Sequence, residues 1–212
     1  MCSARGKNKE VKQKKRKTLM KTDIILAGVG GQGILTIAAA LGAAALNEDY
    51  YLKQAETHGM SQRGGAVVSH LRISDTPVYS DLIPLGKADL ILSVEPLESL
   101  RYLPYLSEEG SLVTNTVEFR NISNYPDVQK FFDEITDKIR IVMINADQIA
   151  KDIGNPKASN MVMLGAASPF INIGSEIIIR GIEDVFKSKR RDIVDSNVKA
   201  FLEGRKFSEE RN

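Results

Sequence analysis

Apolar residues occur along the chain in short runs separated by glycine and polar turns. The run 23–29 is apolar, β-branched and ended by glycine, which predicts a buried strand. The segment that follows, 33–47, is rich in Ala and Leu and predicts a helix that can lie close to a sheet. Comparable apolar runs predict further strands at 50–57, 66–73, 78–80, 88–94, 112–116 and 139–144.

Segments with helical periodicity follow most of these strands. The predicted helices are 96–106, 127–138, 147–153, 159–170, 175–186 and 192–203. Pro96 suits a first helical turn, Pro104 should kink the same helix or end it early, and Gly110 follows its end. Gly204 is expected to stop the last helix. The helix at 127–138 has one apolar stripe, formed by Val128, Phe131, Phe132 and Ile135.

Alternating strands and helices predict an α/β fold with a mainly parallel sheet. One connection departs from that pattern, since only eight residues separate the strand ending at Thr57 from the strand starting at Ala66. A parallel crossover needs a dozen residues or more. We therefore expect a Rossmann-like, mainly parallel sheet with an antiparallel hairpin inserted after the second strand, and a helical C-terminal region.

Charged residues are distributed unevenly along the chain. Residues 1–20 hold eight basic residues and one acid, a net charge of +7, which leaves the remainder at −5. We expect a basic disordered tail at 1–20, a single α/β domain at 21–206 and a frayed C-terminus at 207–212. The acidic domain argues against nucleic acid as a partner. Contact of the tail with RNA or an anionic membrane stays open, as does a true start at Met20.

Cysteine content and hydropathy exclude several classes of protein. Cys2 is the only cysteine, so the chain alone cannot form a disulfide, a Cys-ligated zinc site or an iron–sulfur cluster. No stretch approaches the roughly 20 apolar residues of a membrane span. The basic N-terminus lacks the apolar segment of a secretory signal. We expect a cytoplasmic protein with no metal site and no membrane partner.

The strongest motif is the glycine turn between the first strand and the first helix. Gly28, Gly30 and Gly33 have the spacing G-x-G-x-x-G in the strand–turn–helix context that the motif requires. Such a turn offers backbone N–H groups and a helix N-terminus to a phosphate. It could instead only pack the helix on the sheet. Glu56 is placed to bind the ribose of a dinucleotide, although Gly31 and Gln32 are unusual in dinucleotide sites.

A second glycine-rich loop spans 58–65. His58, Gln62 and Arg63 make it a candidate active-site loop, although no residue can be assigned a catalytic role with certainty. Arg63 could clamp a carboxylate or phosphate, or pair with an acid on another chain. His58 could exchange protons near neutral pH, or only hydrogen-bond the loop. The predicted cofactor-binding residues of the two loops are Gly28, Gly30, Gly31, Gln32, Gly33, Gly64 and Gly65.

Both loops resemble those of a known family. The segments 28–33, 56–67 and 70–74 closely resemble the gamma-type domain of 2-oxoacid:ferredoxin oxidoreductases, and above all the small subunits of indolepyruvate ferredoxin oxidoreductases. The resemblance extends from about Met20 to about Lys206. The chain also lacks the Gly-Asp-Gly diphosphate motif of thiamine-binding chains, which agrees with a subunit that holds no redox cofactor.

The resemblance implies a heteromeric enzyme that oxidatively decarboxylates 2-oxoacids, here arylpyruvates such as indolepyruvate, to acyl-coenzyme A and reduces ferredoxin. It implies thiamine diphosphate and iron–sulfur clusters on a larger partner subunit, and contact of this chain with coenzyme A at 30–33 and 58–65. Alone, the chain would have no activity, and a homodimer would hide its exposed apolar surface. Two alternatives remain: a stand-alone NAD(P)- or FAD-binding protein, and a purely structural assembly subunit.

Overall fold

The computed structural model of the chain describes residues 20–58, 64–120 and 122–211, except for the side chain of His58. Its centre is a six-stranded sheet in the order β2-β3-β1-β4-β5-β6. Neighbouring strands pair in parallel from β1 to β6, whereas β3 runs antiparallel to both β1 and β2. The strands are β1 (Lys21–Val29), β2 (Tyr51–His58), β3 (Ala66–Ser74), β4 (Ala88–Ser93), β5 (Leu106–Asn115) and β6 (Arg140–Ile144). The predicted mainly parallel sheet is confirmed.

The predicted antiparallel hairpin is also confirmed, and it changes the order of the sheet. β3 pairs along its length with β2, from Tyr51 opposite Ser74 to His58 opposite Val67. It pairs equally with β1, from Lys21 opposite Ser74 to Val29 opposite Ala66. Because β3 lies between them, β2 is displaced from β1 to the edge of the sheet.

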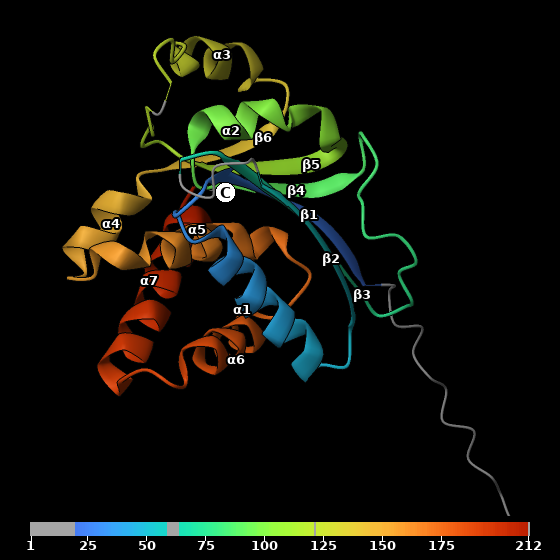
Figure 1. Cartoon of the computed structure of the whole chain (residues 1–212), viewed down its shortest axis with the longest axis vertical. Helices are drawn as coiled ribbons and strands as arrows, with labels where there is room; N and C mark the ends of the chain where they lie inside the picture. Colours follow the sequence, from blue (N-terminus) through green and yellow to red (C-terminus); the bar gives the residue numbers. More distant parts are fainter. Residues whose placement is uncertain (1–19, 59–63, 121, 212) are drawn as a thin grey trace, which may run out of the picture.

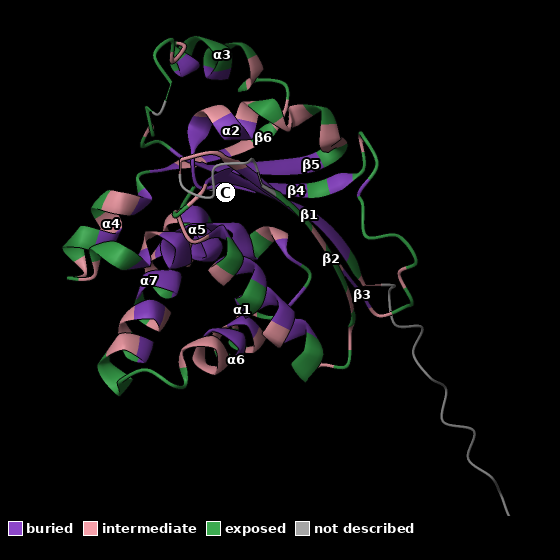
Figure 2. Cartoon of the chain, viewed as in Figure 1, coloured by how far each residue is buried: buried purple, intermediate pink, exposed green. Residues whose placement is uncertain are grey.

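Helices cover the two faces of the sheet unequally. Figure 1 shows α1, α5, α6 and α7 together on one side, and α2 with α3 beyond it on the other. The helices are α1 (Ile34–Asn47), α2 (Pro96–Arg101), α3 (Val128–Ile135), α4 (Ala146–Asp152), α5 (Ser159–Ala167), α6 (Ser175–Phe186) and α7 (Arg191–Glu209). The central strands are buried from both sides (Figure 2). None of the described helices is long and apolar enough to cross a membrane.

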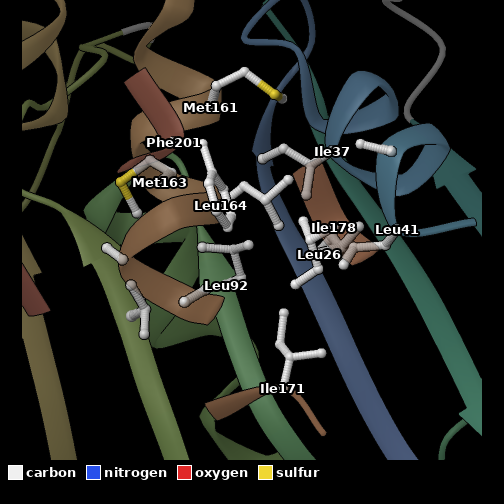
Figure 3. Close-up of a cluster of buried hydrophobic side chains, with 14 of the residues drawn as sticks. Leu26, Ile37, Leu41, Leu92, Met161, Met163, Leu164, Ile171, Ile178 and Phe201 are labelled. Atoms are coloured by element: carbon white, nitrogen blue, oxygen red, sulfur yellow. The ribbon is translucent and has the colours of Figure 1, made fainter. Parts of the chain in front are cut away.

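The main core lies between the sheet and the four-helix side. Apolar side chains from β1, β4, α1, α5, α6 and α7 meet there, and Figure 3 shows part of this cluster. Full burial of one such side chain contributes about 1.5–3 kcal/mol. The labelled members, all at most 5% exposed, are Leu26, Ile37, Leu41, Leu92, Met161, Met163, Leu164, Ile171, Ile178 and Phe201. A smaller cluster around Ile25 and Phe132 covers the opposite face.

The two C-terminal helices α5 and α7 cross closely because each has a glycine at the contact. A Cβ on Gly165 would lie 1.9 Å from the carbonyl oxygen of Phe201, and one on Gly204 would lie 1.9 Å from that of Val162. The prediction that Gly204 ends the last helix is therefore wrong: α7 continues to Glu209. Part of the segment expected to fray is also folded, since Ser208 is fully buried.

Four further expectations about local structure are wrong in whole or in part. No strand forms at 78–80, where the carbonyl oxygen of Ser80 instead accepts a hydrogen bond from the guanidinium of Arg72. The helix predicted at 96–106 ends at Arg101, as Pro104 suggested, and a 3-10 turn follows. Gly110 then lies inside β5, at an irregular pairing with β4. Phe131, placed on the apolar stripe of α3, is 49% exposed.

Candidate functional site

The two glycine-rich loops meet at the edge of the sheet that is formed by the carboxyl ends of the parallel strands. The parallel strands β1, β4, β5 and β6 all end at this edge, and α1 begins there directly after the turn 28–33. The hairpin brings the end of β2 and the start of β3 to the same edge. Ligands of open α/β sheets bind outside the carboxyl ends of the strands, so this edge is the candidate binding site.

The glycine turn is closed by its own residues. The backbone N–H of Gln32 donates to the carbonyl of Val29 over 3.2 Å. In return, the N–H of Val29 donates to Oε1 of Gln32 over 2.8 Å. The side chain of Gln32 therefore caps the end of β1. Gln32, which is unusual in dinucleotide sites, therefore has a structural role within the turn.

Three glycines of the turn are needed for different physical reasons. Gly31 and Gly33 have φ of +102° and +83°, a conformation that side chains disfavour. Gly28 instead packs closely, because a Cβ there would lie 2.4 Å from Cγ2 of Val94. The absence of a side chain at Gly28 thus lets Val94 and the first residue of α1, Ile34, pack against the end of β1.

Backbone hydrogen bonds join the two glycine loops into one structure. The N–H of Gly30 donates to the carbonyl of Gly65 over 2.9 Å, and the N–H of Gly64 donates to the carbonyl of Gly30 over 3.3 Å. The glycine turn is therefore joined to the described end of the second motif, Gly64 and Gly65. Of the candidate active-site loop, Gln62, Arg63 and the side chain of His58 lie outside the described residues.

An open hollow of about 400 Å³ lies on the β2 side of the glycine turn. We call it the apolar hollow; it is lined by Val29, Gly30, Gly31, Gly33, Ile34, Leu35, Glu56 and Val67. Among the described residues that line it, Glu56 is the charged one, and it comes from the edge strand β2. In dinucleotide sites, the ribose-binding acid follows about 20 residues beyond the glycine turn in a plain βαβ unit. Here β3 separates β2 from β1, so Glu56 does not occupy that position.

A second, larger hollow of about 780 Å³ lies on the opposite side of the turn. We call it the polar hollow. Its walls are the turn residues 31–33, Thr36, the connection 154–157 after α4, the first two residues of α5, Phe186, and the first turns of α7. Two charged residues among its described lining are Asp192, which is paired with Arg190 at 2.7 Å, and the exposed Lys157, so a cation lies in the same hollow as the start of α1. The helix N-terminus and this cation together suit a phosphate group.

Asn160 connects the turn to the helices behind it. Its side-chain Nδ2 donates to the carbonyl of Gly33 over 3.2 Å, across 127 residues of sequence. Neither Asn160 nor Lys157 was identified from the sequence, because nothing local marks either residue. Asn160 is the single polar residue among the buried positions of α5, and only the fold brings it to the glycine turn.

Two buried polar groups fix the neighbouring strand ends. Asn115, at the end of β5, donates to Asp147 over 2.7 Å and accepts from the N–H of Ala146 over 3.2 Å. Glu95 follows β4, is 1% exposed, and accepts hydrogen bonds from the N–H groups of Glu98 and Phe119 and from the hydroxyl of Tyr125. Burial and the bond to Glu95 raise the pKa of Tyr125 well above its usual value.

Comparison with known proteins identifies the family of the chain. The model of the family described as pyruvate ferredoxin/flavodoxin oxidoreductase matches residues 23–207. Subunit IorB of indolepyruvate oxidoreductase from Methanothermobacter thermautotrophicus is 37% identical over 194 residues, which cover 87% of this chain and 96% of that one. Its counterpart from Pyrococcus horikoshii is 36% identical over 197 residues, covering 89% and 96%.

A solved structure has the same fold. It is the 2-oxoglutarate:ferredoxin oxidoreductase of Magnetococcus marinus with 2-oxoglutarate, coenzyme A and succinyl-CoA bound, which matches with a TM-score of 0.74 and 21% identity. The match covers 90% of this chain but only 31% of that longer chain. The predicted family resemblance is confirmed by the sequence matches: the chain belongs to the pyruvate ferredoxin/flavodoxin oxidoreductase family.

Proposed function

We propose that this chain is the subunit without redox cofactors of a cytoplasmic, heteromeric indolepyruvate ferredoxin oxidoreductase. The enzyme would oxidatively decarboxylate arylpyruvates to acyl-coenzyme A, with thiamine diphosphate and iron–sulfur clusters on a larger partner subunit and ferredoxin as electron acceptor. Near-complete coverage of the relatives from Methanothermobacter and Pyrococcus, both indolepyruvate oxidoreductase subunits, supports this assignment.

The observation that carries the chemical part of the proposal is the glycine turn with a hollow on each side. Coenzyme A has the two matching parts, an uncharged pantetheine arm that ends in a thiol and a phosphorylated nucleotide. The apolar hollow, with walls such as Ile34 and Leu35, suits the arm. The polar hollow offers Lys157 and the start of α1 to the phosphates. When bound, coenzyme A would supply the thiol that accepts the acyl group, and this chain would bind and orient it.

The loop at 58–65 stays part of the proposed site on sequence grounds. His58, Gln62 and Arg63 are its candidate side chains, since the backbone of Gly64 and Gly65 joins this loop to the turn. We expect Arg63→Ala to lower the activity of the complex more than it lowers the melting temperature of this chain. Equal loss of both would assign Arg63 a structural role.

Reconstitution tests the assignment as a subunit. The purified chain should show no ferredoxin reduction with indolepyruvate, and addition of the larger subunit should restore it. Indolepyruvate should be preferred to pyruvate and 2-oxoglutarate in the complex. Sedimentation of the isolated chain would test whether it forms the expected homodimer. Turnover by the chain alone would contradict the proposal, and so would sub-millimolar binding of NAD(P) or FAD that Glu56→Ala abolishes.

Substitution of Lys157 tests the coenzyme A site. Loss of a charged contact with phosphate should raise the KM for coenzyme A about tenfold in Lys157→Gln, equivalent to about 1.4 kcal/mol, with kcat little changed. Lys151→Gln is the matched control, because Lys151 is an exposed lysine in the last turn of the neighbouring helix α4. Equal kinetics in the two variants would remove Lys157 from the site. A pure assembly subunit would show no change in either.

A further inference from the structure

The start of α1 is held from outside its own helix by Asn160. This residue lies in the first turn of α5 and is only 8% exposed. Its Nδ2 donates to the carbonyl of Gly33 over 3.2 Å, while its Oδ1 accepts from the N–H of Met161 over 3.0 Å. Both ends of the carboxamide are therefore engaged, which fixes the orientation of the side chain.

The bond from Asn160 fixes the turn at the carbonyl of Gly33, which has a second role in the start of α1. It also accepts from the N–H groups of Thr36 and Ile37, over 3.1 and 3.3 Å, and so closes the first turn of α1. A peptide unit is planar, with its N–H pointing opposite to its carbonyl. Fixing the carbonyl of Gly33 therefore also fixes the direction of the N–H of Ile34. That N–H belongs to the first turn of the helix, whose N–H groups have no intrahelical acceptor and attract anions.

Asn160 also fits closely against the turn. A Cβ added to Gly33 would lie only 2.5 Å from Nδ2 of Asn160. Asn160 lines the polar hollow and, with Gln32 and Met163, a smaller cavity of about 70 Å³ behind the turn. The carboxamide thus forms part of the wall against which the glycine turn rests, on the side of the polar hollow.

We propose that Asn160 is a positioning residue for the acyl acceptor, which holds the peptide between Gly33 and Ile34 so that its N–H faces a phosphate of coenzyme A. This inference rests on the function proposed above, since it assigns a task within the same site. It does not make Asn160 a catalytic residue. Asn160 acts through the backbone of the turn, and its loss should weaken binding of the acceptor and leave the steps on the 2-oxoacid unchanged.

Two variants test this in the assembled enzyme. Asn160→Ala removes the carboxamide, and Asn160→Asp keeps its shape but replaces the donor by an oxygen that repels the carbonyl of Gly33. Both should raise the KM for coenzyme A five- to tenfold, with kcat and the KM for indolepyruvate within twofold of wild type. Calorimetric titration of coenzyme A into the complex without 2-oxoacid should show the same loss of affinity, independent of turnover.

Asn172→Ala is the matched control. Nδ2 of Asn172 also donates to a distant backbone carbonyl, that of Lys21, over 3.2 Å and 151 residues of sequence. This bond lies at the start of β1, at the end of the sheet away from the turn. The control should leave affinity for coenzyme A unchanged.

The outcomes separate this inference from the function on which it rests. A wild-type complex whose turnover does not depend on coenzyme A would overturn the proposed function itself. Coenzyme A dependence with unchanged affinity in both Asn160 variants would overturn only the positioning role. Failure of both variants to assemble, with Asn172→Ala intact, would also overturn it, because Asn160 would then be needed for folding rather than for the acceptor.

Discussion

At the scale of single residues, Gly33 combines a left-handed conformation with a close neighbour. Alanine at a φ of +83° costs about 1–2 kcal/mol in any context. At Gly33 the new Cβ would also lie 2.5 Å from Nδ2 of Asn160. Gly154 is a matched control, because it has the same φ of +83° with open space around it. We expect urea unfolding to show a larger loss of stability for Gly33→Ala than for Gly154→Ala, by about 1 kcal/mol. Equal losses would mean that Asn160 moves aside freely.

A second prediction at this scale concerns Tyr125, whose contribution to stability should depend on pH. Removing its hydroxyl in Tyr125→Phe leaves the buried carboxylate of Glu95 with one donor fewer and should cost about 1–2 kcal/mol at pH 8. Burial raises the pKa of Tyr125 in the folded chain above the ordinary value of 10.0, so folding favours the protonated form. Its contribution is complete below pH 10 and is lost as pH rises further. Denaturation at pH 8 and pH 10.5 should therefore show a steeper decline for wild type than for Tyr125→Phe. The exposed Tyr79→Phe should behave as wild type.

At the scale of elements, the crossing of α5 and α7 depends on glycine inside a helix. Gly204→Ala should destabilise the chain by about 3 kcal/mol, the upper end of overpacking costs, because its Cβ would meet the backbone of Val162 at 1.9 Å. Gly42→Ala is the control within α1: its Cβ would meet only the flexible end of Leu52, at 3.2 Å. Helix propensity there favours alanine by up to about 1 kcal/mol. Thermal melting of both variants checks the contrast. A mild effect at Gly204 would show that the helices can separate cheaply.

The same glycine shows where sequence reasoning reaches its limit. Periodicity and short connections were enough to predict the six strands of the sheet, the antiparallel hairpin and the glycine turn, because these depend on neighbours in sequence, but they also predicted a strand at 78–80 that does not form. Gly204 was taken as a helix end because glycine is a local stop signal, whereas here glycine is required by the close contact with Val162 of α5, 42 residues earlier in the chain. Asn160 was missed for the same reason, since its partner is 127 residues distant. At the second loop no local rule assigns a function, so its candidate residues rest on the family motif and stay a prediction.

At the scale of the whole molecule, the two ends of the sheet carry different structures. The carboxyl edge holds the glycine turn and both hollows. The opposite edge holds an ion-pair cluster centred on the fully buried Asp23, which Arg72 and Lys21 contact at 2.9 and 2.6 Å. That cluster secures β1, and the charge of Asp23 is already paired within the chain. Only the carboxyl edge should therefore face the reaction centre of the partner subunit.

Helix α1 allows a direct test of this difference between the two edges of the sheet, because it carries an exposed leucine near each end. Leu35 is 51% exposed and lines the apolar hollow, whereas Leu46 is 64% exposed and lies eleven residues further on, about 16 Å along the helix. With Cys2 replaced by serine, Leu35→Cys and Leu46→Cys each place one reactive thiol on the same element. A bulky maleimide at position 35 should abolish most turnover of the reconstituted complex, through assembly or access of coenzyme A, and the same label at position 46 should spare it. Mass spectrometry would verify equal labelling. Comparable inhibition from both ends of α1 would mean that the partner surrounds the helix, and that function is not confined to the edge where the strands end.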